Sequence, residues 1–206
     1  TSIIEIGVDN MNKFVDTTFY SASNGYMTIQ QSEISNSKFF NYYSLQLEYS
    51  AITNSEFRNI QFIEAGSGVL RNNKFISVYR LTASRQVEDN IFTDGQLSLH
   101  GFAPLSLTGN YFYNLHGFLV YLATKGSFQI TNNVFDEVVP RAANSYYIVS
   151  AQTYGAISTI NATNNYWNGA VSTSQINSMI YDYRDSVEYA LLTVNPVQTS
   201  YVLPKF

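Results

Sequence analysis

A six-residue unit recurs eight times along the chain. It reads apolar, any residue, Asn/Asp/Gly, small polar or Asn, any residue, aromatic. The copies are FVDTTF (14–19), ISNSKF (34–39), ITNSEF (52–57), LRNNKF (70–75), VEDNIF (87–92), LTGNYF (107–112), ITNNVF (130–135) and ATNNYW (162–167). The closing aromatic residues follow one another after 20, 18, 18, 17, 20, 23 and 32 residues. Helix-pair repeats need periods of ~34 residues or more, so this spacing favours a solenoid of short strands.

The third position of the unit always holds a residue type that tolerates left-handed backbone angles. A bend is therefore expected there in every coil, at Asp16, Asn36, Asn54, Asn72, Asp89, Gly109, Asn132 and Asn164. The fourth position is small and polar. Its residues are expected to stack as an internal ladder of hydroxyls and amides, comprising Thr17, Ser37, Ser55, Asn73, Asn90, Asn110, Asn133 and Asn165.

Two apolar positions flank the bend, and this pattern predicts two strands that meet at a corner. A third strand is expected within 27–29, 45–47, 97–99 and 147–149. Three strands and three turns then make one coil, and the coils pair as parallel strands. The sequence thus predicts an all-β fold, a single-stranded parallel β-helix of about eight coils over residues 1–170, with the closing aromatic rings stacked inside. A β-sandwich with eight unrelated Phe residues is the disfavoured alternative.

Residues 171–206 depart from the repeat and are expected to cap the rod. Ile176, Met179, Ile180 and Tyr183 follow helical spacing, and Ser172 with Gln175 has the pattern of a capping box. The remainder, through Val194, Pro196 and Val197, is expected to run as an extended tail along the rod. No comparable cap precedes the first coil. We therefore expect one domain that is a piece of a longer protein, with further β-helix coils or another domain upstream.

Composition narrows the class of partner. The net charge is −4 and no basic stripe is present, so nucleic acid is not an expected partner. No run of 18 apolar residues occurs, so direct membrane insertion is not expected. The chain has no Cys, which excludes disulfides and thiolate zinc sites. Nucleophile elbows, phosphate loops and zinc-ligand spacings are also absent from the sequence, and no cofactor is expected.

The last repeat and the segment after it carry a family resemblance. The stretch ATNNYWNG (162–169), followed by Ile176, Ile180 and Asp182, is similar to the Asn-Asn-Tyr-Trp-Gly ending and helical cap of many secreted bacterial and animal surface proteins. The chain as a whole resembles right-handed parallel β-helix repeat proteins of the pectin-lyase-like group. The resemblance implies a right-handed coil and an extracellular or cell-surface location. One departure is Asn168, where the family has Gly directly after Trp.

Enzymes of that group carry catalysis on the exposed face of one strand column. Here Gln30, Glu48, Glu64, Ser84 and His100 are the expected outward positions. Glu48 and Glu64 would then stack on neighbouring coils ~5 Å apart, which suits a retaining glycosidase or an oxygen-ligand metal site. His100 would follow two coils further on. The Asp-Asp pair and Arg-x-Lys of polygalacturonase-like sites are absent, so ordinary solvated side chains are the favoured interpretation of this face.

Two further features bear on binding. Tyr42, Tyr43, Tyr146, Tyr147 and Tyr154 are expected near turns or loops, where Tyr suits interfaces and sugar stacking. The three last lie in the longest insertion, residues 138–154, and long loops on rigid scaffolds often carry binding. Asn161 begins the only glycosylation sequon, Asn-Ala-Thr.

The favoured function is a non-catalytic structural or adhesive segment of an extracellular or cell-surface protein, which binds a protein partner or a glycan. The alternative is a carbohydrate-active enzyme of the pectin-lyase-like group, a polysaccharide lyase or glycoside hydrolase that uses Glu48, Glu64 and His100. An ice-binding rod ranks last, because it needs a flat Thr-rich face and the strand columns here are mixed.

Overall fold

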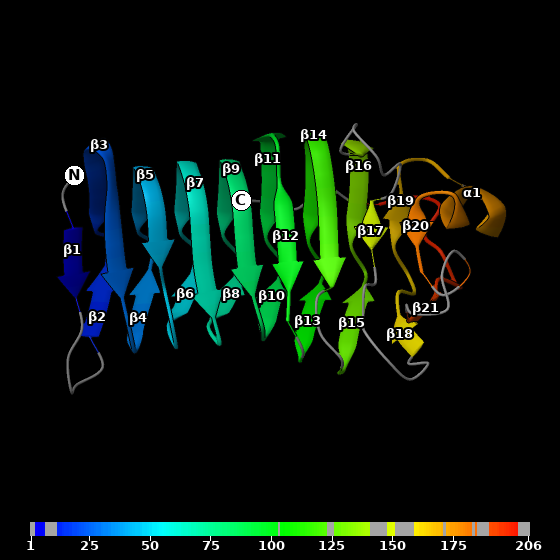
Figure 1. Ribbon diagram of the computed structural model, residues 1–206, viewed down its shortest axis with the longest axis horizontal. Helices are drawn as coiled ribbons and strands as arrows, with labels where there is room; N and C mark the ends of the chain where they lie inside the picture. The colour runs from blue at the N-terminus through cyan, green and yellow to red at the C-terminus, as the bar shows by residue number, and fades with distance from the viewer. Residues whose placement is uncertain are drawn as a thin grey trace.

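The computed structural model describes residues 3–6, 12–102, 104–122, 126–140, 148–150, 159–170, 172–182, 184 and 190–201. They form a parallel β-helix whose coils are stacked along one long axis (Figure 1). Two sheets run the length of the rod, one of nine strands and one of twelve. Neighbouring coils pair in parallel, as for β2 with β4 and β5 with β7. The predicted fold class is confirmed.

The nine-stranded sheet contributes one short strand per coil. Its strands are β2 (Asn12–Val15), β4 (Ser32–Ser35), β6 (Ala51–Thr53), β8 (Val69–Arg71), β10 (Gln86–Glu88), β13 (Leu105–Thr108), β15 (Phe128–Thr131), β18 (Thr159–Asn161) and β21 (Leu191–Thr193). The twelve-stranded sheet contains β1 (Ile3–Ile6), β3 (Thr18–Ile29), β5 (Lys38–Gln46), β7 (Glu56–Gly66), β9 (Lys74–Ala83), β11 (Ile91–Gly95), β12 (Ser98–Gly101), β14 (Tyr111–Leu122), β16 (Val134–Pro140), β17 (Val149–Ser150), β19 (Tyr166–Trp167) and β20 (Ile180–Tyr181).

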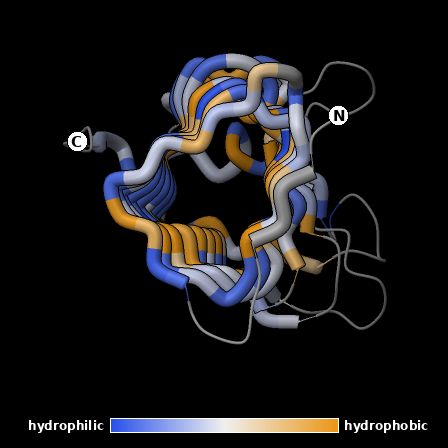
Figure 2. The backbone as a smooth tube through the Cα atoms, turned by 90° about the vertical axis from the view of Figure 1, so that its left-hand side faces the viewer, coloured by the Kyte–Doolittle hydropathy of each residue, from blue (hydrophilic) through white to orange (hydrophobic). Residues whose placement is uncertain are grey.

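The number of complete coils is slightly smaller than the eight expected. Six coils, from β2 to β14, have strands of both sheets along their whole described course. The next two coils continue both sheets, but their connections include the residues 141–147 and 151–158, which lie outside the described part of the chain. Viewed along the rod, the strands of successive coils lie over one another (Figure 2).

The corner between the two sheets, which we call the first corner, is built as the repeat predicts. All eight third-position residues have left-handed backbone angles, with φ between 51° and 70°. Left-handed angles cost free energy for non-glycine residues, and this cost is lowest for Asn and Asp, because their short polar side chains can hydrogen-bond locally. The identity of the third residue thus fixes where each coil turns.

The fourth-position residues form the predicted ladder inside this corner. Each backbone N–H donates to the side-chain oxygen of the ladder residue on the next coil, over 2.8–3.2 Å. From Asn73 onward the ladder is made of fully buried Asn residues. Their Nδ2 atoms also donate to main-chain carbonyls of the preceding coil, for example from Asn90 to Leu70 at 3.0 Å. The ladder therefore satisfies buried polar groups that the bend removes from the sheets.

The closing aromatic residues form one internal stack, as expected. Ring centroids of successive members, from Phe19 to Trp167, lie 4.6–5.1 Å apart. Phe39 and every later member are at most 1% exposed, whereas Phe19 on the first coil is half-buried. Each ring buries ~150–250 Å², so this column supplies a large part of the core.

A second bend divides the long strands; three turns per coil were expected, but the residues that form this one were not predicted. Asn24, Asn41, Asn59, Ser77, Asp94, Asn114, Glu137 and Asn168 have φ between 48° and 61°. Some of their side chains also bond between coils. Asn59 Nδ2 donates to Asn41 Oδ1 at 3.2 Å, and Asn114 Nδ2 donates to Asp94 Oδ1 at 2.8 Å. This second corner turns the long strand, so that one strand covers two sides of the coil.

The cap differs in detail from the prediction. Helix α1 (Thr173–Asn177) begins with the expected capping box: Ser172 N–H donates to Gln175 Oε1 at 3.1 Å and Gln175 N–H donates to Ser172 Oγ at 3.3 Å. The helix ends before Ile180, which lies in β20 and pairs with Val149 of β17. Tyr183 lies outside the described residues. The apolar residues with helical spacing are therefore divided between a short helix, which contains Ile176, and a further strand of the sheet, which contains Ile180.

Asp182 holds the cap to the last rung. Its carboxylate is fully buried and accepts from Arg184 Nη2 at 2.6 Å and from the backbone N–H of Leu192 at 2.9 Å. The charge is thus paired and hydrogen-bonded, as burial requires. The tail adds one more first corner to the β-helix, because Asn164 N–H donates to Pro196 O at 2.6 Å.

Candidate functional site

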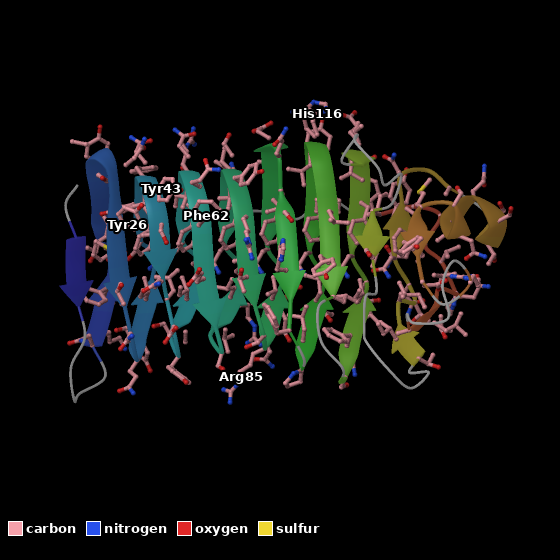
Figure 3. All side chains as sticks on the ribbon, viewed as in Figure 1. Tyr26, Tyr43, Phe62, Arg85 and His116 are labelled. Atoms are coloured by element: carbon pink, nitrogen blue, oxygen red, sulfur yellow. The ribbon has the colours of Figure 1, made fainter. Side chains whose placement is uncertain are left out.

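Four aromatic rings from four successive coils form an external column on the twelve-stranded sheet. Tyr26, Tyr43, Phe62 and Tyr79 contact one another in order, with centroids 5.2, 5.2 and 6.2 Å apart. Tyr26 is 40% and Tyr43 is 41% exposed, and the other two are half-buried. Figure 3 shows the three labelled members on the same face of neighbouring coils. We call these four residues the aromatic face.

Strand alternation places Tyr26 and Phe62 of the aromatic face outside, whereas Tyr43 and Tyr79 point outward directly after the buried Tyr42 and Val78. Met27, Leu45, Ile63 and Leu81 are paired in register across the coils and buried in the core. The residues that flank this inward column must therefore point outward. Next to the second bend at Asn41, the structure separates the two Tyr residues that were expected to lie together near a turn. Tyr42 is 2% exposed and Tyr43 points outward, so the prediction of exposure is wrong for Tyr42 and confirmed for Tyr43. Burial raises the pKa of the Tyr42 hydroxyl.

A polar column runs beside the aromatic face. Thr28, Gln46, Glu64, Thr82 and His100 occupy one register position on five successive coils. Thr28 Oγ1 donates to Gln46 Oε1 at 3.0 Å, and Gln46 Nε2 donates to Glu64 Oε2 at 3.4 Å. Hydroxyl, amide and carboxylate groups thus follow one another along the rod, one on each coil. The column offers both donors and acceptors to a ligand on this face.

His100 lies in a cluster at the far end of this column. Its Nε2 is 2.9 Å from Ser98 Oγ, and its Nδ1 is 3.5 Å from Arg80 Nη2. Its ring centroid lies 5.3 Å from that of Tyr121 on the next coil. The expected place of His100, two coils beyond Glu64 in the same column, is confirmed.

The expected stacking of Glu48 on Glu64 is wrong. Glu64 pairs with Gln46, and Glu48 follows two residues later, at the next turn. A Cβ built on Gly66 would lie 3.5 Å from Glu48 Cγ, so Gly66 is the residue that faces Glu48. Ser84 belongs with this second position, because its N–H donates to Gly66 O at 2.9 Å. The carboxylate pair that a retaining glycosidase needs on adjacent coils is therefore not formed by these two residues.

A hollow of about 300 Å³ adjoins the aromatic face at the second corner. Asn24, Asn59, Tyr43 and Tyr79 are among the residues that line it. Amide groups and Tyr rings make up most of its walls, so it offers both hydrogen-bonding groups and aromatic surface. Across the described part of the chain, no group of three or more His, Cys, Asp or Glu side chains is placed to hold a metal ion.

The remaining predicted residues lie elsewhere. Asn161 is exposed in β18, and its Oδ1 accepts from Thr163 N at 3.2 Å and from Thr163 Oγ1 at 2.8 Å. Tyr146, Tyr147 and Tyr154 lie outside the described residues. No helix in the described ranges is long and apolar enough to span a membrane.

Comparison with known proteins finds distant matches among solved structures and no matching family model. No family model and no curated protein matches the chain. Among solved structures, one match is a trypsin-treated variant of QnrB1, a plasmid-mediated fluoroquinolone resistance protein. It is 10% identical, the alignment covers 95% of this chain and 93% of that one, and the TM-score is 0.24. A second trypsin-treated QnrB1 variant is 9% identical, with coverage of 91% and 92% and a TM-score of 0.25.

Proposed function

We propose that this chain is a non-catalytic structural or adhesive β-helix segment of an extracellular or cell-surface protein, and that its aromatic face binds a glycan. The observation that carries the proposal is the external column of four contacting rings, flanked by a column of hydrogen-bonding side chains. A column of contacting rings over four coils, two of them exposed and two half-buried, is unusual for a surface whose only role is to face solvent.

The chemistry of the two columns suits a polysaccharide. Sugar rings have apolar C–H faces that pack on the faces of Tyr and Phe, as other apolar groups do. Their hydroxyl groups need donors and acceptors, which Gln46, Glu64 and Thr82 supply alongside. Because both columns repeat once per coil, they offer a ladder of similar subsites to a polymer.

Two further features support an extracellular β-helix of the pectin-lyase-like group. The Asn165-Tyr166-Trp167 ending closes the ladder and the internal stack, as expected of the cap that the sequence resembles. Asn161 is exposed, so its sequon is sterically open to a glycosyltransferase. The enzyme alternative loses its main support, because Glu48 and Glu64 do not share a column.

The test is polysaccharide binding by variants of the aromatic face. Retardation in gels that contain neutral or acidic polysaccharides measures binding without a known ligand. Tyr43→Ala, alone and with Tyr26→Ala, should abolish retardation. Tyr20→Ala is the matched control, because Tyr20 is 63% exposed and outside the aromatic face.

Equal retardation of wild type and both aromatic-face variants would exclude this face as a glycan site. Release of reducing or unsaturated sugar ends by the wild type, lost in Glu64→Gln, would instead establish the enzyme.

A further inference from the structure

A groove follows the outside of the first corner, and its two ends differ. Toward the C-terminus it holds the protein's own tail. Gln198 N–H donates to Asn165 O at 3.0 Å, and Tyr201 then reaches back over three coils. The Tyr201 ring lies 4.8 Å from Tyr166 and 5.7 Å from Tyr111, and its hydroxyl bonds to the carboxylate of Asp136. An extended segment of polypeptide therefore occupies this end of the groove.

The same groove continues toward the N-terminus, where no described residue of the tail covers it. A hollow of about 630 Å³ lies along the corner residues Asn36, Asn54, Asn72 and Asp89 and ends at Gly109. Gly109 also lines the hollow of about 370 Å³ that Tyr201 borders. The open part and the tail-covered part are thus consecutive stretches of one groove.

The strand column beside the groove changes character beyond the stretch that the described part of the tail contacts. In register, it passes from Lys38, Glu56 and Lys74 through Ile91 to Tyr111, Val134 and Tyr166. The tail covers the aromatic and apolar stretch. The open stretch presents Lys38 and Lys74, which are exposed, with Glu56 between them.

The open stretch carries Lys38, Glu56 and Lys74 on the strand column and Asp89 at the corner next to Gly109, so its positive charge is concentrated at the two Lys residues. Glu56 is neutralised by Arg58, whose Nη2 lies 2.9 Å from Glu56 Oε1. In the described part of the chain, neither Lys38 nor Lys74 has an acidic partner within ion-pair distance. The two ammonium groups stand two rungs apart, roughly 10 Å. Three residues of an extended polyproline-like chain span ~9 Å, so acidic residues three apart on such a chain can reach both.

We propose that the open groove binds an extended acidic segment of a partner protein, with two carboxylates spaced three residues apart placed on Lys38 and Lys74. The stacked side-chain amides of Asn36, Asn54 and Asn72 then face the backbone of the bound segment, whose N–H and C=O groups they can satisfy. This site lies on a different column from the aromatic face and is independent of glycan binding.

The experiment uses the full chain and a fluorescein-labelled peptide, Pro-Glu-Pro-Pro-Glu-Pro-Tyr. Fluorescence anisotropy should show saturable binding that weakens in high salt. The double variant Lys38→Gln/Lys74→Gln should raise Kd at least about fivefold, since each exposed pair contributes modestly. Arg85, labelled in Figure 3, is exposed and does not line the groove, so Arg85→Gln should change Kd less than about twofold.

Two control peptides test the recognition itself. Replacing both Glu residues by Lys should abolish binding, and moving the second Glu one place nearer the first should weaken it. The proposal is overturned if the original peptide shows no saturable binding, if the Lys peptide binds equally well, or if the double variant binds as the wild type does. Loss of polysaccharide retardation in the double variant would assign the groove to the glycan instead.

Discussion

The backbone N–H and the side-chain Nδ2 of Asn73 both donate to Oδ1 of Asn90 on the next coil, over 2.9 and 3.1 Å. One buried amide oxygen therefore satisfies two donors of its neighbour. In the same way, the backbone N–H and Nδ2 of Asn90 donate to Oδ1 of Asn110, and those of Asn110 donate to Oδ1 of Asn133. The ladder is a single connected network, so loss of one member leaves groups on neighbouring coils without partners.

Asn90→Ala should lower the free energy of unfolding by at least about 3 kcal/mol, because it leaves two donors of Asn73 and the carbonyl of Leu70 without hydrogen-bond partners in the core. Urea titration followed by circular dichroism measures the loss. Asn114→Gly, at the outer second corner, removes one partly exposed hydrogen bond and should cost less than about 1.5 kcal/mol. Equal losses would show that the ladder is not a principal source of stability.

The first corner makes a prediction about backbone conformation. Asn54 has φ of 51° and an exposed side chain. Asn54→Val should destabilise the fold by about 1–2 kcal/mol or more, since a β-branched residue is strained at left-handed angles. Asn54→Gly should be nearly neutral, because Gly adopts these angles freely. Thermal midpoints of the two variants provide the comparison, and a Val variant as stable as the Gly variant would contradict it.

The internal and external aromatic residues should respond differently to truncation. Phe57 is fully buried between Phe39 and Phe75, with centroids 4.8 Å away on both sides. Phe57→Ala should cost about 3–5 kcal/mol. Phe62→Ala, five residues later on the outer face, should cost markedly less and should instead impair polysaccharide retardation. Urea unfolding together with retardation in polysaccharide gels tests both, and the reverse ranking would refute the assignment of the two columns.

Tyr201 should make the fold sensitive to alkaline pH. Its hydrogen bond to Asp136 and its partial burial raise the pKa of the hydroxyl above the usual value of 10.0. The neutral form is therefore favoured in the folded state, so its stabilising contribution is complete below pH ~10 and is lost as pH rises beyond that value. The midpoint of urea unfolding should fall between pH 9 and 11.

Tyr201→Phe is the matched variant for this pH effect. It keeps the ring against Tyr111 and Tyr166 and removes the ionisable hydroxyl. The variant should be less stable than the wild type at pH 8 and should show a smaller decrease toward pH 11. An identical decrease in both proteins would mean that other groups, such as Tyr111 and Tyr113, whose pKa values are also raised, dominate the alkaline response.

The first corner could be predicted from the sequence because its chemistry is local. A left-handed residue, a ladder residue and an inward ring are needed at fixed offsets in every coil, as in Asn72, Asn73 and Phe75. The second corner could not. Its residue types range from Asn59 through Ser77 to Glu137, and its distance from the preceding aromatic residue changes in the first and last coils.

The error at Glu48 has a similar physical origin. Gln46 and Glu64 both stand seven residues after the ring of their own coil, so a count from Phe39 and Phe57 places them together. Glu48 was matched with Glu64 in place of Gln46 because two stacked carboxylates would suit catalysis. Beyond the second corner, the types of the outward residues do not indicate how neighbouring coils are aligned, because outward positions accept almost any residue. Only the hydrogen-bonded register between coils determines which outer residues are neighbours.

The ladder also gives the rod a way to change its length. Coils two and three both carry Ser at the ladder position, and the segments 37–54 and 55–72 have equal length and matching register. Duplication of such an 18-residue segment would create an additional coil whose donors and acceptors meet the same partners as before. The distance between whatever is attached at the two ends can thus grow in steps of one strand spacing, ~4.8 Å, without a new core having to evolve.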